Sequence, residues 1–231
     1  MHQEEASIKG LKNTIESCKE MSIPVFTLES SRATTELCIL GGHCRTDKSP
    51  LNTVGHRHPY TPFYSGLFAP YKNKPIHFAE IGVAGGSSVA MWSRYFTQAT
   101  FSFYDKDQNF LDNSQRFQIP RAKFYQMDVA VPESIRAGFA APGELFDIIL
   151  DDSSHDVWDQ KKIVGEVFPF LKPGGIFLIE DVFRNLDNQL YMDIISPYLS
   201  QIAFFGFYEM EHKDKWSPGW DNDKILMLVK N

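Results

Sequence analysis

The sequence contains few cysteines, no long apolar run and no excess of positive charge. Its three cysteines, Cys18, Cys38 and Cys44, lack the C-x-x-C spacing of a metal site, and an odd number of thiols fits a reducing compartment. No apolar run is long enough to span a bilayer, and the polar N-terminus lacks the apolar stretch of a secretion signal. The formal net charge of −6 disfavours a nucleic-acid backbone as the main partner. We therefore expect a cytoplasmic protein that binds neither a membrane nor nucleic acid.

The chain is long enough, and apolar enough, for one α/β domain. It has 231 residues, of which 43% are hydrophobic, and this size suits a single core. From Pro75 onward, short apolar runs alternate with helical stretches, which predicts a mainly parallel sheet with helices on both faces. Seven runs predict strands: IHFAEIGV, TFSFYD, AKFYQMD, FDIILDD, GIFLIED, IAFFGFYEM and KILMLVK. The last two are expected to close the sheet as an antiparallel hairpin.

The first 74 residues have helical and turn patterns but no clear strand. Between Ala6 and Met21, the residues Ile8, Leu11 and Ile15 have helical spacing. Residues 44–59 are rich in turn formers and predict a loop. We therefore divide the chain into a short helical N-terminal segment, residues 1–74, and an α/β domain, residues 75–231.

A glycine loop joins the first predicted strand to the following helix. Glu80 precedes Gly82, Gly85 and Gly86, and glycines let a backbone approach a ligand closely. The helix that starts near Ser87 offers free N–H groups to a carboxylate. Such loops also bind dinucleotides, but Glu80 would repel a pyrophosphate and attract an ammonium group. The pattern thus favours S-adenosylmethionine, and a plain strand-to-helix turn is the alternative.

Acidic residues follow the next two strands. Asp105 ends TFSFYD, 23 residues after Gly82, at the position expected of an acid that binds ribose hydroxyls. Asp107 is the alternative for this role. Asp128 follows the next strand, where it or its neighbours would bind the adenine amino group. Each of these acids could instead cap a turn or a helix.

A second acidic group lies in DIILDDSSHD and LIEDVF. Asp152 follows one strand, Glu180 and Asp181 follow the next, and the ends of adjacent strands bring side chains together. Three converging carboxylates repel one another unless a cation neutralises them, which predicts Mg²⁺ or a similar divalent ion. His155 is placed to act as general base for an acceptor hydroxyl. Asp151 is the alternative metal ligand and a cofactor-binding candidate, although strand alternation points it to the other face.

An ordered set of motifs resembles the metal-dependent macrolide sugar O-methyltransferases of the mycinamicin and tylosin type. The motifs are TDK at 46–48, the H-x-Y and LF elements of HPYTPFYSGLF, EIGVAGGSS, FDIILDDSSH and FPFLKPGGIFLIED. The resemblance implies a Rossmann-like class I methyltransferase fold, with Asp152, Glu180 and Asp181 as magnesium ligands and His155 as base. It also implies that TDK, with Thr46, and the Tyr60/Tyr64 pair form a lid over the cofactor. Core packing is the alternative for Tyr64.

Two departures limit what the resemblance implies. The family usually has DDGSH where this chain has DDSSH, and its members often carry a larger N-terminal auxiliary region. The identity of the acceptor is therefore not transferred.

We predict an S-adenosylmethionine-dependent, Mg²⁺-assisted O-methyltransferase that acts on a hydroxyl of a sugar or glycosylated natural product. The alternatives are a phenol or catechol acceptor, a nicotinamide-dependent oxidoreductase, and a non-catalytic S-adenosylmethionine-binding protein. Trp216 and Trp220 are candidates for stacking on the acceptor, or are structural. Homo-oligomerisation is left open.

Overall fold

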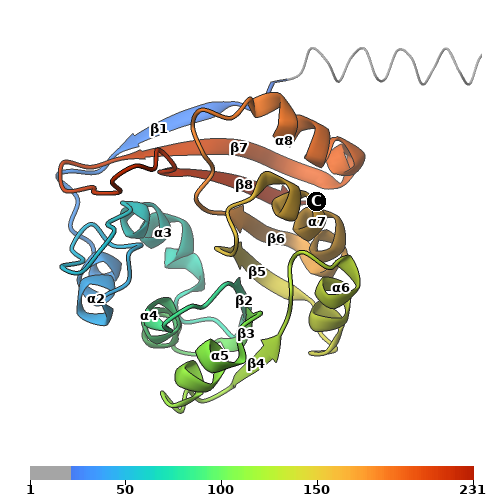
Figure 1. Cartoon of the computed structure of the whole chain (residues 1–231), viewed down its shortest axis with the longest axis horizontal. Coiled ribbons are helices and arrows are strands. Elements are labelled where there is room, and N and C mark those ends of the chain that lie inside the picture. Colours follow the sequence, from blue (N-terminus) through green and yellow to red (C-terminus); the bar gives the residue numbers. More distant parts are fainter. Residues whose placement is uncertain (1–21) are drawn as a thin grey trace, which may run out of the picture.

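The computed structural model describes residues 22–231 (Figure 1). The strands are β1 (Val25–Glu29), β2 (His77–Ile81), β3 (Thr100–Asp105), β4 (Ala122–Gln126), β5 (Phe146–Asp151), β6 (Leu171–Ile179), β7 (Ile202–Glu211) and β8 (Lys224–Lys230). The helices are α2 (Glu36–Cys44), α3 (Tyr60–Phe68), α4 (Ser87–Tyr95), α5 (Gln108–Gln115), α6 (Pro132–Ala140), α7 (Val157–Val167) and α8 (Asn188–Ile195), with short 3-10 helices η1 (Ala69–Tyr71), η2 (Phe168–Phe170) and η3 (Ser196–Gln201). The helix expected between Ala6 and Met21 lies outside the described residues.

Within residues 22–231, the strands form one sheet in the order β1-β7-β8-β6-β5-β2-β3-β4. Its pairs are parallel except those of β8, which runs antiparallel to both β6 and β7. The seven predicted strands and the closing antiparallel hairpin are therefore confirmed. No helix in this part of the chain is both long and apolar enough for a membrane span.

The sheet has one strand more than the sequence predicted. β1 lies in the segment where no clear strand was expected, and it pairs in parallel with Phe207–Glu211 of β7. Four of its five residues are exposed, so the segment lacks the buried alternation that marks a strand in a sequence.

The two faces of the sheet carry separate cores, because successive strand residues point to opposite sides. Ala79, Ile149 and Phe177 face the core under α6, α7 and α8. Phe78 and Ile148 face the core under α3, α4 and α5. Figure 1 shows these two helix groups on opposite sides of the strands.

Helices α2 and α3, from the N-terminal segment, belong to the second of these cores. Leu37, Tyr64 and Phe68 are fully buried there. The division of the chain at residue 74 stays a prediction, but in the described part this segment packs as a wall of the α/β domain.

Candidate functional site

The sheet reverses its strand order between β2 and β5, and two cavities open at the carboxyl edge next to this point, where ligands of such sheets bind. The first, of about 250 Å³, has Ile81, Asp105, Phe110, Met127 and Val129 in its wall. The second, of about 420 Å³, has Thr46, Asn52, Val54, His56, Ser87 and His155 in its wall. Both share Gly82, Ala84, Asp152 and Ser153. The two cavities are therefore neighbours separated by the glycine loop and the end of β5.

The glycine loop is shaped by close backbone contact. Gly82 has φ +86°, and a Cβ on it would lie 2.1 Å from the carbonyl oxygen of Asp152. Gly86 has φ +81° and would place a Cβ 2.6 Å from the Ser114 hydroxyl. Only glycine fits both positions. Gly86 directly precedes α4, and Ser87, the first residue of the helix, lines the second cavity.

Glu80 lies fully buried beneath this loop, on the side of α4. It accepts hydrogen bonds from the Ser88 hydroxyl at 2.9 Å and from Trp92 Nε1 at 3.2 Å, and Lys48 Nζ lies 3.8 Å away. Burial raises the pKa of Glu80 to about 7 although the charge of Lys48 opposes the shift. Burial thus favours the neutral carboxyl, and a cationic group bound nearby would stabilise the charged form.

The three acids at the ends of β3 and β4 have different surroundings. Asp105 lines the first cavity and accepts hydrogen bonds from the N–H groups of Val83 and Ala84, at 3.0 and 3.1 Å. Asp107, the alternative candidate, caps α5. Asp128 is exposed and accepts from the N–H of Ala130. Its neighbours Met127 and Val129, rather than Asp128 itself, line the first cavity.

The ends of β2, β5 and β6 bring Glu80, Asp152 and Glu180 to the same face of the sheet. Glu80 follows the alternation of Phe78, and Glu180 follows that of Leu178, on the side of α3 and α4. Asp151 points to the other face, as predicted, where the Ser153 hydroxyl donates to it at 2.6 Å. Burial raises the pKa of Asp151 to about 7.

Lys48 is buried among these carboxylates. Its Nζ donates to Asp152 and to Glu180. Burial lowers the pKa of Lys48, but the charges of Asp152, Glu180 and Glu80 outweigh it and hold the pKa well above its ordinary value. Burial likewise raises the pKa of Glu180 well above its usual range, against the charge of Lys48. One ammonium group thus spans the predicted cofactor acid and two predicted metal ligands.

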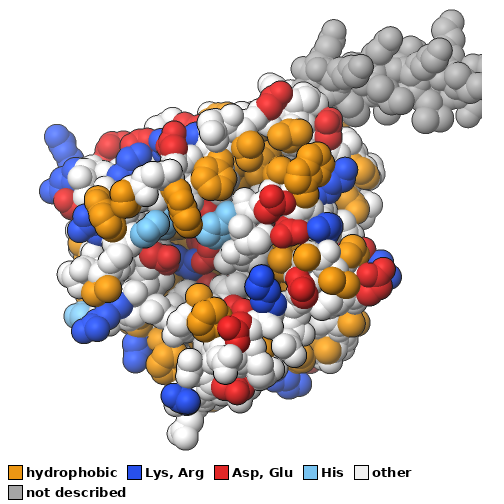
Figure 2. All heavy atoms as spheres, viewed as in Figure 1, with side chains coloured by type: hydrophobic (Ala, Val, Ile, Leu, Met, Phe, Trp, Pro, Cys, Tyr) orange, Lys and Arg blue, Asp and Glu red, His pale blue; other side chains and the backbone are white. Residues whose placement is uncertain are grey.

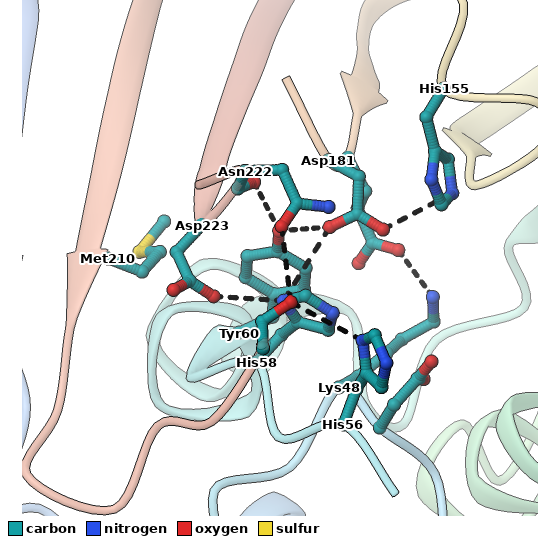
Figure 3. A network of polar contacts seen from close by, with 12 residues as sticks. Lys48, His56, His58, Tyr60, His155, Asp181, Met210, Asn222 and Asp223 are labelled. Carbon is teal, nitrogen blue, oxygen red and sulfur yellow. Dashed lines mark hydrogen bonds and ion pairs between the residues drawn. The ribbon is translucent and has the colours of Figure 1, made fainter. Parts of the chain in front are cut away.

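His155 lies against the other side of the acidic group (Figure 3). Its Nε2 is 3.2 Å from both Asp152 Oδ1 and Asp181 Oδ2. Burial lowers the pKa of His155, but the hydrogen bond to Asp152 and the charge of Asp181 raise it to about 9. His155 and Asp181 both have positive φ, +57° and +54°. Non-glycine residues seldom adopt this conformation, and such departures gather at functional sites.

A layer of buried side chains from the N-terminal segment supports Asp181 and Glu180. The Tyr60 hydroxyl donates to Asp181 and to the carbonyl oxygen of Asn222. The Tyr64 hydroxyl donates to Glu180, and its ring stacks on Phe68. Both tyrosines are buried, so they lie beneath the carboxylates rather than forming a lid. For Tyr64, the core-packing alternative describes the structure.

The sequence interpretation missed two cationic residues of this site. Lys48 was noted only as part of the TDK motif, and His58 only as the first residue of H-x-Y. His58 Nδ1 lies 2.9 Å from Asp223 and 3.7 Å from Asp181. Burial lowers the pKa of His58, but Asp181 and Asp223 raise it to about 9. Both residues lie in motifs that the sequence showed, but most of their partners, Glu80 apart, lie more than 100 positions away.

The donor set fits a divalent cation. Among the described residues, five carboxylates gather here: Glu80, Asp151, Asp152, Glu180 and Asp181. The cationic groups that contact them are Lys48, His58 and His155. These cationic groups offset part of the charge of the carboxylates, and oxygen ligands of this kind suit a divalent ion. Ligand atoms of Asp152, His155 and Asp181 lie within 4.8 Å of one another, so this trio is a second candidate metal-ligand set beside the predicted Asp152, Glu180 and Asp181.

Strand order and the carboxyl-edge cavities define the fold as that of the class I, Rossmann-like methyltransferases. The solved structure of the MycE methyltransferase from the mycinamycin biosynthetic pathway, in complex with Mg, SAH and mycinamycin VI, superposes with a TM-score of 0.64. It is 20% identical, and the match covers 87% of this chain and 56% of that chain. The fold prediction is therefore confirmed.

In sequence, the chain is similar to sugar O-methyltransferases of antibiotic pathways, which confirms the resemblance. The 8-demethyl-8-alpha-L-rhamnosyl tetracenomycin-C 2'-O-methyltransferase of Streptomyces olivaceus is 33% identical over 132 residues, 54% of this chain and 33% of that protein. The mycinamicin VI 2''-O-methyltransferase of Micromonospora griseorubida is 26% identical over 200 residues, 79% of this chain and 48% of that protein. The chain thus spans half or less of the length of these two relatives. No family model matches it.

Proposed function

We propose that this chain is an S-adenosylmethionine-dependent, Mg²⁺-assisted O-methyltransferase that acts on a hydroxyl of a sugar or a glycosylated small molecule. One observation carries the proposal: Asp152 and His155, beside Glu180 and Asp181, stand at the wall of a cavity that adjoins the glycine loop. A histidine beside carboxylates at such a cavity supports an acid–base role for it, and the names of the two sequence relatives support a sugar hydroxyl as acceptor.

The two cavities suit the parts of the cofactor and the acceptor differently. The first is lined by apolar side chains with Asp105 at one side, which suits an adenosine whose ribose hydroxyls donate to a carboxylate. The second continues past Gly82 and Ser87, where the free N–H groups of α4 suit a carboxylate. The same cavity reaches His155 and leaves room for an acceptor hydroxyl. A sulfonium methyl would lie between the two, beside Asp152.

In the proposed reaction, the acceptor oxygen attacks the sulfonium methyl, its O–H bond breaks, and the cofactor leaves as a neutral thioether. Bound at the carboxylates, a divalent cation would neutralise them and polarise the acceptor hydroxyl. His155 is protonated at neutral pH as long as the unneutralised carboxylates hold its pKa at about 9. Relieved of those charges, its Nε2 would accept the hydroxyl proton. Tyr60 and Tyr64 would hold Asp181 and Glu180 in place through their hydroxyls.

Calorimetry tests the proposal directly. We expect S-adenosylmethionine to bind and NAD not to bind, and we expect EDTA to abolish methyl transfer to glycosides in a radiolabelled-methyl assay. Absence of S-adenosylmethionine binding would contradict the cofactor assignment. Full activity in EDTA would contradict the metal assignment alone.

His155→Asn distinguishes a base from a metal ligand. Asparagine tolerates the positive φ of this position better than most residues. As a base, His155 should contribute on the order of 10² to 10⁴ to turnover, so methyl transfer should fall about 100-fold or more while Mg²⁺ affinity stays within a few fold. The Mg²⁺ affinity is measured by calorimetric titration of Mg²⁺ in the presence of S-adenosylhomocysteine. A large loss of Mg²⁺ affinity would instead assign His155 to the metal.

A phenol or catechol acceptor and a non-catalytic S-adenosylmethionine-binding role remain as the alternatives. A screen of methyl transfer across sugars, glycosides and phenols separates them. The cytoplasmic location, the absence of nucleic-acid and membrane partners, and the oligomeric state stay predictions.

A further inference from the structure

An aromatic group lies beside the second cavity, where the loop between β7 and β8 meets the segment between α2 and α3. Its members are His56, Trp216 and Trp220, called here the aromatic rim. Trp216 is 46% exposed and Trp220 is 48% exposed. Figure 2 shows hydrophobic side chains beside histidines around a hollow that has acidic and basic side chains at its base. Two exposed indoles next to residues that line the cavity form an apolar surface that a ligand can cover.

The loop that carries the two indoles is fixed to the other wall of the cavity. Arg57 and Trp216 exchange two backbone hydrogen bonds, of 2.9 and 3.0 Å. The Arg57 guanidinium lies 5.8 Å from the centre of the Trp216 ring. The His56 ring lies 5.9 Å from Trp216 and 5.2 Å from Trp220, edge to face in both pairs. The indoles are therefore held in place while their outer faces remain open.

The rim adjoins the reacting groups. Trp220 lies 6.2 Å from the His155 ring, between ring centres, and His56 lines the same cavity as His155 and Asp152. A six-membered ring that packs against the indole of Trp220 would therefore lie beside His155. The exposed carboxylate of Asp47 in the cavity wall offers hydrogen-bond acceptors to the rest of such a ring. One apolar face and several polar edges are the features of a sugar.

We propose that Trp220, assisted by Trp216, is the acceptor subsite, and that it stacks on the C–H face of the saturated sugar ring whose hydroxyl is methylated. The inference rests on the proposed function and adds the residues that select the acceptor. Indoles offer a large rigid apolar face, and aromatic contacts contribute beyond the area they bury. Trp220 thus acts in binding and orientation, and the proton is moved by His155.

The test uses the whole chain with S-adenosylmethionine and Mg²⁺, and methyl α-L-rhamnopyranoside and catechol as acceptor probes. We expect Trp220→Ala to raise KM for the glycoside about tenfold or more. The affinity for S-adenosylhomocysteine should stay unchanged, and Trp220→Phe should recover most of the loss. Trp216→Ala should have a smaller effect, because no contact joins Trp216 to His155. Trp158→Ala is the matched control, since its exposed indole contacts Lys161 on its own helix.

An unchanged KM for the glycoside in Trp220→Ala would overturn the subsite, as would a wild-type preference for catechol over the glycoside. Failure of the wild type to bind S-adenosylhomocysteine, or to methylate either probe, would instead count against the proposed function. Each variant should have the same thermal unfolding temperature as the wild type. A change in KM then reflects binding of the acceptor and not loss of the fold.

Discussion

Replacing Asp152 by alanine is expected to abolish metal-dependent methyl transfer, with a loss of about 100-fold or more in kcat/KM. Asp152 belongs to both candidate ligand sets, as Asp181 does, and it also contacts Lys48 and His155. Its removal leaves those two cationic groups without their common partner. Mg²⁺ titration should show a large loss of affinity, while S-adenosylhomocysteine should bind with nearly wild-type affinity.

Two variants make this result interpretable. Asp152→Asn keeps the shape of the side chain, so it separates loss of charge from loss of packing. Asp112→Ala removes an exposed acid on α5 whose contact is with Gln108 of the same helix, and we expect wild-type activity from it. If Asp152→Ala retained metal-dependent turnover, Asp152 would not be a ligand.

The parts of the site that local sequence patterns encode were predicted well. Strand alternation and the acids at strand ends follow from short stretches of sequence, because a parallel sheet puts consecutive strand ends at one edge. The placement of Asp105 at the first cavity follows from this rule, and strand alternation turns the buried Asp151 to the opposite face of the sheet. In contrast, β1 was missed because its exposed residues show no buried alternation.

The charge balance of the site could not be predicted in the same way. Lys48 is 104 positions from Asp152 and 132 from Glu180, and its place depends on how residues 44–59 fold back over the sheet. Local patterns define that segment only as a loop. Tyr64 illustrates the same limit, because its helical spacing fits a lid and a core equally well. Contact with Glu180 decides between them.

These long-range contacts change the chemistry that the acids alone suggested. Three carboxylates without partners would be expected to attract a cation strongly. Here Lys48 already contacts two acids and His58 approaches a third. In the proposed function, a divalent cation would therefore bind a site whose negative charge is partly compensated.

Gly82→Ala is expected to have the largest effect on the fold of the site. The new Cβ would lie 2.1 Å from the carbonyl oxygen of Asp152, and the backbone at this position has φ +86°. The overlap cannot be relieved by a side-chain rotation, since the opposing atom belongs to the backbone of the loop after β5. We expect a loss of stability of about 4 kcal/mol or more, or no folded protein, and loss of S-adenosylhomocysteine binding in whatever folds.

Gly85→Ala is the matched control for stability, because it lies in the same loop but a Cβ there meets no atom within 4 Å. Its free energy of unfolding should stay within about 0.5 kcal/mol of wild type. Urea unfolding followed by tryptophan fluorescence measures both variants. Equal unfolding midpoints for Gly82→Ala and Gly85→Ala would show that the end of β5 can move away from the loop. The close contact between Gly82 and Asp152 would then not determine the shape of the wall that the two cavities share.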